Sequence, residues 1–506
     1  QFCVMVCVLF LIGMIPCVMA EGGSVLKIAG PWDGQTDPHV SGTSLQRLGV
    51  TETLTDVDQS AALIPGLATS WDVSGDQLVW TFHLRDGVKF HDGTAFTAKT
   101  MKKSLDDSLK KSKTFAKVPI KDITAVDDKT LQISLTKPFP ALPAYMAKGE
   151  SAALADASLD QGNVTKPIGT GPFKFESFNP KEEMITVKNP DYWGKKASVD
   201  EVDYKVVPEA ATRSLQLQGG DIDIAQIMPP EISSTFASKS DFKVNDQPIA
   251  RVRMIDYNCE SGPFSDEKVR QAMNYAFDRQ AIVDYVLDGV GSSASGLFPP
   301  QFYWANKDIQ PFTYDPDKAK SMLAEAGWKD TNNDGILDKD GKKFSIKLVT
   351  YPERAELPSI AEVMQDQLKK IGIDVELKVI DTDSANAMRN KGDFDIALVG
   401  RGLLFTPDPD EIMMTDYDSA GTSGDGWGAY RWSNSRVDEL IEKARATTDA
   451  AERKKYYDEV QKIVIDESPV AYLNYYVNQD ITSNKVKGYR MHPTELSYHL
   501  EDVTLG

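Results

Sequence analysis

Residues 344–379 read FSIKLVTYPERAELPSIAEVMQDQLKKIGIDVELKV. The segment 359–372 begins with the spacing of a capping box and places its apolar residues on one face, which predicts a helix. A strand candidate precedes it at 344–351, and apolar residues alternate along 375–379 after it. A strand, a helix and a strand in this order predict a β-α-β unit, with a further strand at 394–400.

The rest of the chain continues this alternation of helix-like and strand-like segments. Apolar stripes with helical spacing predict helices at 265–276, 315–326 and 437–444. The segment 78–93 predicts a β-hairpin, because its first strand alternates and Asp86-Gly87 supplies the positive φ angles of a tight turn. The sequence therefore predicts α/β lobes.

Composition and charge exclude some classes of function. The chain has 506 residues, which is enough for two or three lobes, and 41% of them are apolar. Its net charge of −19 argues against nucleic acid, which needs clusters of Lys and Arg, and against an anionic membrane surface as the main partner.

Residues 1–20 stand apart from the body of the chain. Residues 4–20 carry no charge and end in Val18-Met19-Ala20, a pattern that a signal peptidase reads. This predicts a secretory signal and an extracytoplasmic protein; a membrane anchor is the alternative, because the apolar run is nearly long enough to span a bilayer. Cys259 is the only cysteine beyond this segment, so no internal disulfide is expected.

Several sequence blocks carry a family resemblance. They are PGLATSW at 65–71, WTFHLRDGVKFHDG at 80–93, PIGTGPF at 167–173, NPDYWG at 189–194, GGDID at 219–223, and VRQA with NYA within 269–276. Together they make the chain resemble family 5 of the bacterial and archaeal extracellular solute-binding proteins, the peptide and nickel binders of ABC importers.

The resemblance implies an α/β, type II periplasmic-binding-protein fold, with two lobes joined by hinge strands and an additional inserted domain. Domain I, in lobe 1, would comprise 24–50, 167–255 and 476–506. Domain II would be the insertion at 51–166, and domain III, lobe 2, would be 256–475.

The resemblance also implies a function. The chain would capture a small peptide or peptide-like solute between its lobes and deliver it to the permease and ATPase subunits of an ABC importer. It would act as a monomer, without enzymatic activity and without a required cofactor. A nickel chelate is an alternative ligand, and a solute sensor for a membrane receptor is an alternative of another class, because it would share the fold.

Candidate ligand-binding residues follow the strand predicted at 394–400. Arg401, Leu403 and Phe405 lie where α/β lobes present ligands, and Arg401 is suited to grip a carboxylate unless it forms a surface salt bridge. In peptide-binding members of the family, an aspartate three residues before an acidic-Pro pair anchors the peptide amino terminus. Phe405 stands at that position here, so Asp408 or Asp410 would have to replace the anchor.

Other candidates are scattered along the chain. Trp427 and Trp432 lie in a Gly-rich loop, where they would stack on a ligand or pack the loop onto its lobe. Lys148 lies near the position of an arginine that helps hold an anionic chelate in nickel-binding members. His39 would ligate nickel if it lay at the cleft entry, although a lone histidine is more often structural.

An acidic loop resembles a calcium site. Asp330, Asn332, Asp334 and Asp338 have the spacing of oxygen ligands, so a calcium ion bound there would have a structural role. The twelfth position holds Gly341 in place of the expected glutamate, so the loop is not an EF-hand, and the sequence favours a solvated acidic turn over a calcium site.

Overall fold

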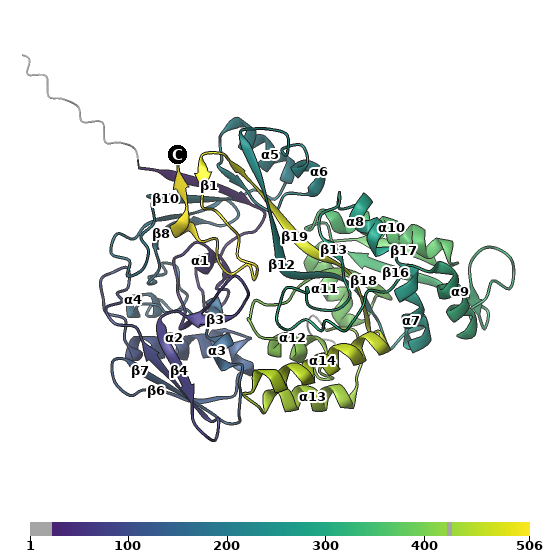
Figure 1. The fold of residues 1–506 in the computed structure, drawn as a ribbon, viewed down its shortest axis with the longest axis horizontal. Helices are drawn as coiled ribbons and strands as arrows, with labels where there is room; N and C mark the ends of the chain where they lie inside the picture. The colour runs from purple at the N-terminus through teal and green to yellow at the C-terminus, as the bar shows by residue number, and fades with distance from the viewer. Residues whose placement is uncertain (1–22, 423–427) are drawn as a thin grey trace, which may run out of the picture.

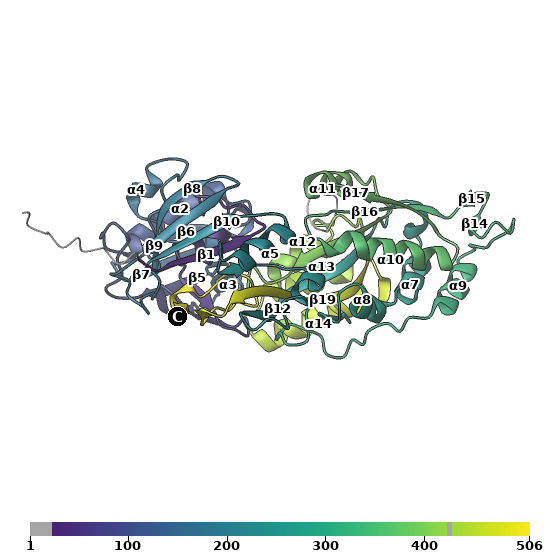
Figure 2. The ribbon, with the colours of Figure 1, turned by 90° about the horizontal axis from the view of Figure 1, so that it is seen from above.

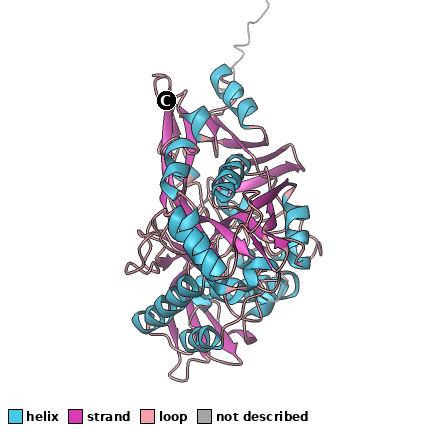
Figure 3. Cartoon of the chain, turned by 90° about the vertical axis from the view of Figure 1, so that its right-hand side faces the viewer, coloured by secondary structure: helices cyan, strands magenta, loops and turns pink. Residues whose placement is uncertain are grey.

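The structure is a computed structural model that describes residues 23–422 and 428–506. Its elements form two groups that are joined by the long strands β12 (Phe242–Tyr257) and β19 (Val470–Ser483) (Figures 1 and 2). Helices and strands are mixed throughout both groups, as predicted (Figure 3). The predicted signal segment 1–20 lies outside the described residues. Within the described residues, no helix combines the length and the apolar character needed to cross a bilayer.

One sheet extends through both groups. Its strand order is β17-β16-β18-β12-β19-β11-β1-β10-β9-β8. On one side of β12 and β19 lie β16 (Ser345–Thr350), β17 (Asp374–Val379) and β18 (Ile396–Gly402), and on the other lie β1 (Val25–Gly30), β8 (Phe173–Asn179), β9 (Glu183–Lys188), β10 (Glu201–Val206) and β11 (Ile224–Ala225).

The predicted β-α-β unit is confirmed. Strand β16 pairs in parallel with β17 and with β18, and α10 (Glu356–Lys370) connects β16 to β17. The capping box predicted at Ser359 is wrong, because α10 begins earlier, after Ala355. This start buries Leu357 completely, and a proline at position 358 is tolerated in a first helical turn.

The remaining helices follow their sequence signals closely. They include α2 (Ala98–Lys111), α3 (Leu142–Tyr145), α5 (Ala210–Gly219), α7 (Glu267–Ala276), α9 (Pro316–Glu325), α12 (Asp410–Asp416), α13 (Ser435–Arg445) and α14 (Ala450–Glu467). Asp266 and Asp315 cap α7 and α9 with their side chains.

Three main hydrophobic cores organise the molecule. A small core runs from Leu54 to Ala155, and a large core runs from Ala250 to Tyr475. A first core collects residues from the beginning, middle and end of the chain, such as Leu26, Phe173 and Val503, and we count with it the smaller cluster around Ala29 and Met228, which shares strands β1 and β11 with it. We call the segments that build these cores the small unit, the large unit and the first unit. The residue boundaries of the three domains given above stay a prediction.

On each of the strands β12 and β19, two adjacent residues belong to different cores, one to the first core and the next to the large core. Ile249 belongs to the first core and Ala250 to the large core; Tyr476 and Tyr475 make the same change on β19. At this point the ladder between the strands shifts its register. The exchange of cores therefore coincides with an irregularity in the sheet.

The hairpin predicted at 78–93 is wrong in its second half. Strand β5 (Val79–Leu84) pairs with β4 (Ala68–Val73) on one edge and with β7 (Thr130–Leu135) on the other, in the sheet order β4-β5-β7-β6, where β6 is Ile120–Ala125. Both edges of β5 are occupied, so the segment after the turn has no edge to join, and Lys89 forms a single bridge with Ala95 instead.

Two of the sequence blocks meet at the carboxyl group of Glu52. It accepts hydrogen bonds from the Thr170 hydroxyl at 2.7 Å, the Tyr192 hydroxyl at 2.7 Å and the Trp193 ring N–H at 3.0 Å. A Cβ atom at Gly171 would lie 2.2 Å from the carbonyl oxygen of Gly49, so this close backbone approach requires glycine. These blocks therefore fasten the small unit to the first unit.

We expect Glu52→Gln to stabilise the protein increasingly as the pH rises. Burial raises the pKa of Glu52 to about 7, because it disfavours the charged form more than the three hydrogen bonds favour it. A carboxyl group whose pKa is raised on folding contributes stability below its unfolded pKa of 4.5. This contribution is lost as the pH rises through the folded pKa of about 7. Glutamine can keep the three contacts by accepting from Thr170 and Trp193 and donating to the Tyr192 oxygen. The variant should therefore gain about 1–3 kcal/mol over the wild type at pH 8.

Thermal unfolding of both proteins between pH 5 and pH 8 checks this expectation. The difference in unfolding temperature should grow with pH. A difference that is constant over this range would contradict the raised pKa of Glu52.

Candidate functional site

A cavity of about 450 Å³ lies between the first unit and the large unit, beside the strands that join them. Its walls are residues 31–32, 208–211, Arg213 and 227–232 from the first unit, Arg253, Val290 and 352–356 from the large unit, and 476–479 from β19. Known ligand pockets occupy about 300–1,000 Å³. The cavity is therefore large enough for a small solute.

Most of the walls come directly after strands. Trp32 follows β1, Glu209 follows β10, Ile227 follows β11 and Arg354 follows β16. Ligands of α/β sheets bind at the carboxyl ends of strands, because the connecting loops there supply side chains and backbone groups. Strands from both halves of the sheet have their carboxyl ends at this one cavity. We therefore take the cavity as the candidate binding site.

Arg354 is the cation that the cavity leaves available. Its guanidinium carbon lies 5.1 Å from the ring centre of Tyr476 and 5.7 Å from that of Trp32. Among the described residues, its side chain makes no hydrogen bond or ion pair. Burial lowers the pKa of Arg354, but Tyr476 and Glu356 outweigh this effect and hold the pKa above its usual value. The group is charged, held between two rings and free to bind an anion.

The two other arginines of the cavity are already engaged. Arg253 lies over the Tyr476 ring at 3.6 Å and donates to Glu356 from Nε at 3.2 Å and from Nη2 at 3.1 Å. Arg213 donates to the carbonyl oxygens of Val207 and Ile227, at 2.6 and 3.0 Å, and burial lowers its pKa to about 10. These two arginines hold the walls in place.

Carboxylates stand at the rim of the same cavity. Glu209 and Glu231 are exposed on the first unit, and Glu353 is exposed beside Arg354 on the large unit. A solute with a carboxylate at one end and an ammonium group at the other would find partners of opposite charge for both. The arrangement is suited to a zwitterion with an apolar body, because proline, isoleucine, methionine and aromatic side chains make up much of the remaining wall.

The residues predicted from the loop after 394–400 are engaged inside the large unit. Arg401 forms a two-pronged ion pair with Asp416, at 2.7 Å for both contacts, and Leu403 is buried in the large core. Asp408 binds Arg453 through both of its oxygens, at 2.6 and 2.8 Å. Phe405 lies 5.6 Å from the guanidinium carbon of Arg251. None of these four residues lines the 450 Å³ cavity.

Trp432 and Lys148 do not line the cavity either. The Trp432 ring N–H donates to Glu467 at 2.8 Å and the side chain is buried in the large core. Trp427 lies outside the described residues. Lys148 is buried and binds Glu411.

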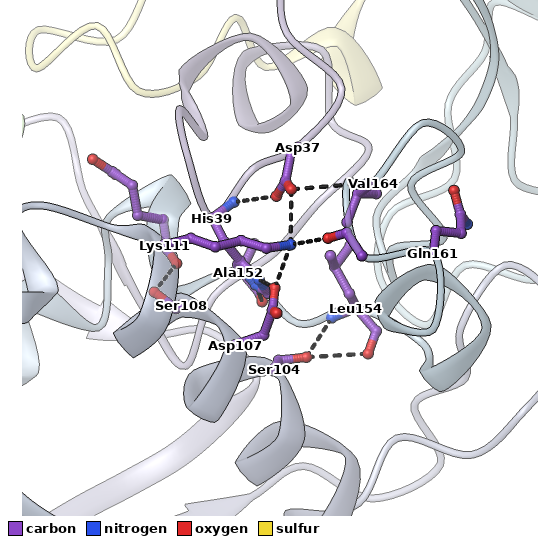
Figure 4. Close-up of polar contacts among 12 residues, drawn as sticks. Asp37, His39, Ser104, Asp107, Ser108, Lys111, Ala152, Leu154, Gln161 and Val164 are labelled. Carbon is purple, nitrogen blue, oxygen red and sulfur yellow. Dashed lines mark hydrogen bonds and ion pairs between the residues drawn. The ribbon is translucent and has the colours of Figure 1, made fainter.

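His39 is completely buried between the first unit and the small unit (Figure 4). Its Nδ1 lies 2.8 Å from Asp107, and its Nε2 lies 3.0 Å from the carbonyl oxygen of Ala152. The possible metal-ligand atoms of Asp37, His39 and Asp107 lie within 4.8 Å of one another. The ammonium group of Lys111 occupies the cation position, at 2.9 Å from Asp37 and 2.8 Å from Asp107. The chain's own lysine therefore already supplies a cation to this cluster.

The acidic loop directs its carboxylates at its own backbone. Asp330 accepts from the N–H of Gly335 at 3.0 Å, Asp338 accepts from that of Thr331 at 3.0 Å, and Asp334 pairs with Lys343 at 2.6 Å. Within the described ranges, this loop is not among the places where three His, Cys, Asp or Glu ligand atoms converge. Calcium binding at Asp330, Asn332, Asp334 and Asp338 stays a prediction.

The sequence contained a signal for the residues that were missed. Arg354 follows a strand of the predicted β-α-β unit in the same way that Arg401 follows the next one. Asp416 neutralises Arg401, whereas no carboxylate of residues 23–422 and 428–506 forms an ion pair with Arg354, a difference that only the tertiary structure reveals.

Comparison with known proteins assigns the family. Residues 62–424 match the model of the bacterial extracellular solute-binding proteins, family 5 Middle. The chain is 32% identical over 468 residues to the oligopeptide-binding protein AppA of Bacillus subtilis, covering 88% of this chain and 84% of that protein. It is also 32% identical over 481 residues to the dipeptide-binding protein of Escherichia coli, covering 88% of this chain and 86% of that protein.

Solved structures agree. The structure of AppA in complex with a nonapeptide matches with a TM-score of 0.80 at 30% identity, covering 96% of this chain and 99% of that one. NikZ of Campylobacter jejuni in complex with Ni(L-His) matches with a TM-score of 0.84 at 26% identity, covering 95% of this chain and 99% of that one. The predicted two-lobed type II periplasmic-binding fold is confirmed. The chain belongs to family 5 of the bacterial extracellular solute-binding proteins.

Proposed function

We propose that the chain is the extracytoplasmic solute-binding component of an ABC importer, and that it captures a small peptide or peptide-like solute in the cavity between the first and large units. The observation that carries this proposal is the guanidinium of Arg354, which no described residue pairs, in a cavity with carboxylates at its rim. A peptide supplies a carboxylate for Arg354 and an ammonium group for Glu209 or Glu231. The names of the relatives AppA and dipeptide-binding protein support the same solute class.

The proposed partners are the permease and ATPase subunits of the importer, with the chain acting as a monomer. The solute would favour the closed arrangement of the lobes, because both walls of the cavity contact it only when they are close together. A membrane receptor that recognises the closed form would make the same protein a solute sensor.

A nickel chelate is the second candidate solute, and the similarity to NikZ favours it. The described residues that line the cavity include no histidine and no cysteine. A nickel ion would therefore enter with its own organic chelator, whose carboxylate would bind Arg354.

Native mass spectrometry of the secreted protein, purified without refolding, tests the proposal together with metal analysis and calorimetry against a peptide panel. A copurified peptide would support the first candidate, and nickel with a small organic acid would support the second. A protein that carries no solute and gives no heat with any peptide or nickel–histidine complex would contradict both.

A further inference from the structure

The small unit contacts the large unit directly, although no strand connects them. Helix α3 of the small unit lies beside α12 of the large unit (Figure 1), and Lys148 follows α3 in the chain. The Tyr145 hydroxyl donates to Asp410 at 3.2 Å. The Lys148 ammonium donates to both oxygens of Glu411, at 3.0 and 2.8 Å. These contacts join the two lobes at a place distant in sequence from β12 and β19.

Burial strengthens this contact relative to an ordinary surface ion pair. The side chain of Lys148 is 7% exposed and that of Glu411 is 28% exposed. Burial lowers the pKa of Lys148, but Glu411 and Glu150 outweigh it and raise the pKa above its usual value. Burial raises the pKa of Glu411, but Lys148 outweighs it, so the pKa lies below its usual value. Both groups are therefore charged, in surroundings that screen them weakly.

Each side of the contact is held in position by its own unit. Arg445 places its Nε 2.8 Å from Asp410, and the Thr406 hydroxyl donates to Glu411, both within the large unit. In the small unit, the Tyr145 ring packs edge-on against Phe139, with ring centres 5.2 Å apart. The surfaces that meet are therefore already formed before they touch.

We propose that Tyr145 and Lys148, with Asp410 and Glu411, form a latch by which the small unit holds the two lobes closed. The inference rests on the proposed function, in which closure captures the solute, and it gives the small unit a role in that function. The four residues act as positioning residues, because they change the balance between open and closed forms without contacting the solute. In the open form each polar group is hydrated, so a substitution affects the closed form alone.

A distance measurement without any solute tests the latch. Spin labels at Asp86→Cys in the small unit and Lys462→Cys in the large unit, both exposed, report the separation of the units in a Cys259→Ser background. Lys148→Gln and Glu411→Gln should each shift the distance distribution toward the longer distances of the open form. The ratio of open to closed molecules should rise by at least about tenfold. The exchange Lys148→Glu with Glu411→Lys should restore the short distances, which a general loss of packing would not do.

Lys137→Gln is the matched control. Lys137 lies 3.9 Å from Glu442 across the same two units, but both side chains are more than half exposed, at 57% and 75%. This variant should leave the distribution unchanged, because exposed pairs contribute little. All variants should keep the wild-type unfolding temperature. Distributions of Lys148→Gln and Glu411→Gln that match the wild type would overturn the latch. Because no solute is present, this failure is distinct from a failure to find the solute.

Discussion

Arg354→Gln is expected to weaken solute binding by at least about 100-fold, the loss that follows when one partner of a desolvated charge pair is removed. Glutamine keeps a polar group of similar reach but has neither the charge nor the forked geometry that binds a carboxylate. The rings of Trp32 and Tyr476 hold the arginine in place, so little ordering entropy opposes binding in the wild type. Titration calorimetry with the solute identified by mass spectrometry measures the effect.

Arg436→Gln is the control for this prediction. Arg436 pairs with Glu439 and Glu459 on the exposed faces of α13 and α14, and its side chain is 45% exposed. Its replacement should leave solute affinity unchanged. If Arg354→Gln bound the solute as tightly as the wild type, the anion would have to be anchored elsewhere, and the loop of Arg401 and Asp408 would become the first place to look.

The second large effect is expected on stability. Asp408→Asn should lower the free energy of unfolding of the large unit by about 3–5 kcal/mol, the cost of breaking a buried ion pair. Asp408 and Arg453 are both nearly completely buried, and Arg453 also donates to the carbonyl oxygen of Ala444. Loss of the carboxylate leaves the guanidinium buried without its counter-charge.

Scanning calorimetry at neutral pH measures this change. Asp466→Asn removes an exposed partner of Lys462, and it should change stability by less than about 0.5 kcal/mol. The double variant Asp408→Leu with Arg453→Met should recover much of the loss, because it buries no unpaired charge. If Asp408→Asn instead abolished solute binding while unfolding at the wild-type temperature, Asp408 would be a solute anchor.

Local patterns predicted most of the fold. The β-α-β unit, the helices capped by Asp266 and Asp315, and the strand at Val79–Leu84 depend on neighbouring residues, so they could be predicted from periodicity and capping. The hairpin failed because β4 occupies one edge of β5 and β7, which lies more than 40 residues further along the chain, occupies the other. Strand pairing at that distance has no local signature in the sequence.

The binding site was harder to predict than the fold. The rule that ligands bind after strands applies equally to Arg354 and Arg401, and only Arg354 lines the cavity. The two arginines differ because Asp416, on α12, forms an ion pair with Arg401. Likewise, His39 and Lys111 are far apart in the sequence, so nothing local indicated that a lysine would fill the histidine's acidic cluster.

The register shift between β12 and β19 has a mechanical consequence. Pro248 pairs with Val477 and Val252 with Tyr475, so residues 249–251 lie opposite a single residue of the other strand. A ladder with such an interruption bends and is more strongly twisted there than along its regular stretches. Both covalent connections between the lobes pass through this one pivot, next to Tyr476 in the cavity wall. We therefore expect the size of the bound solute to set the angle between the two lobes in the closed form. An importer could recognise this angle without contacting the solute.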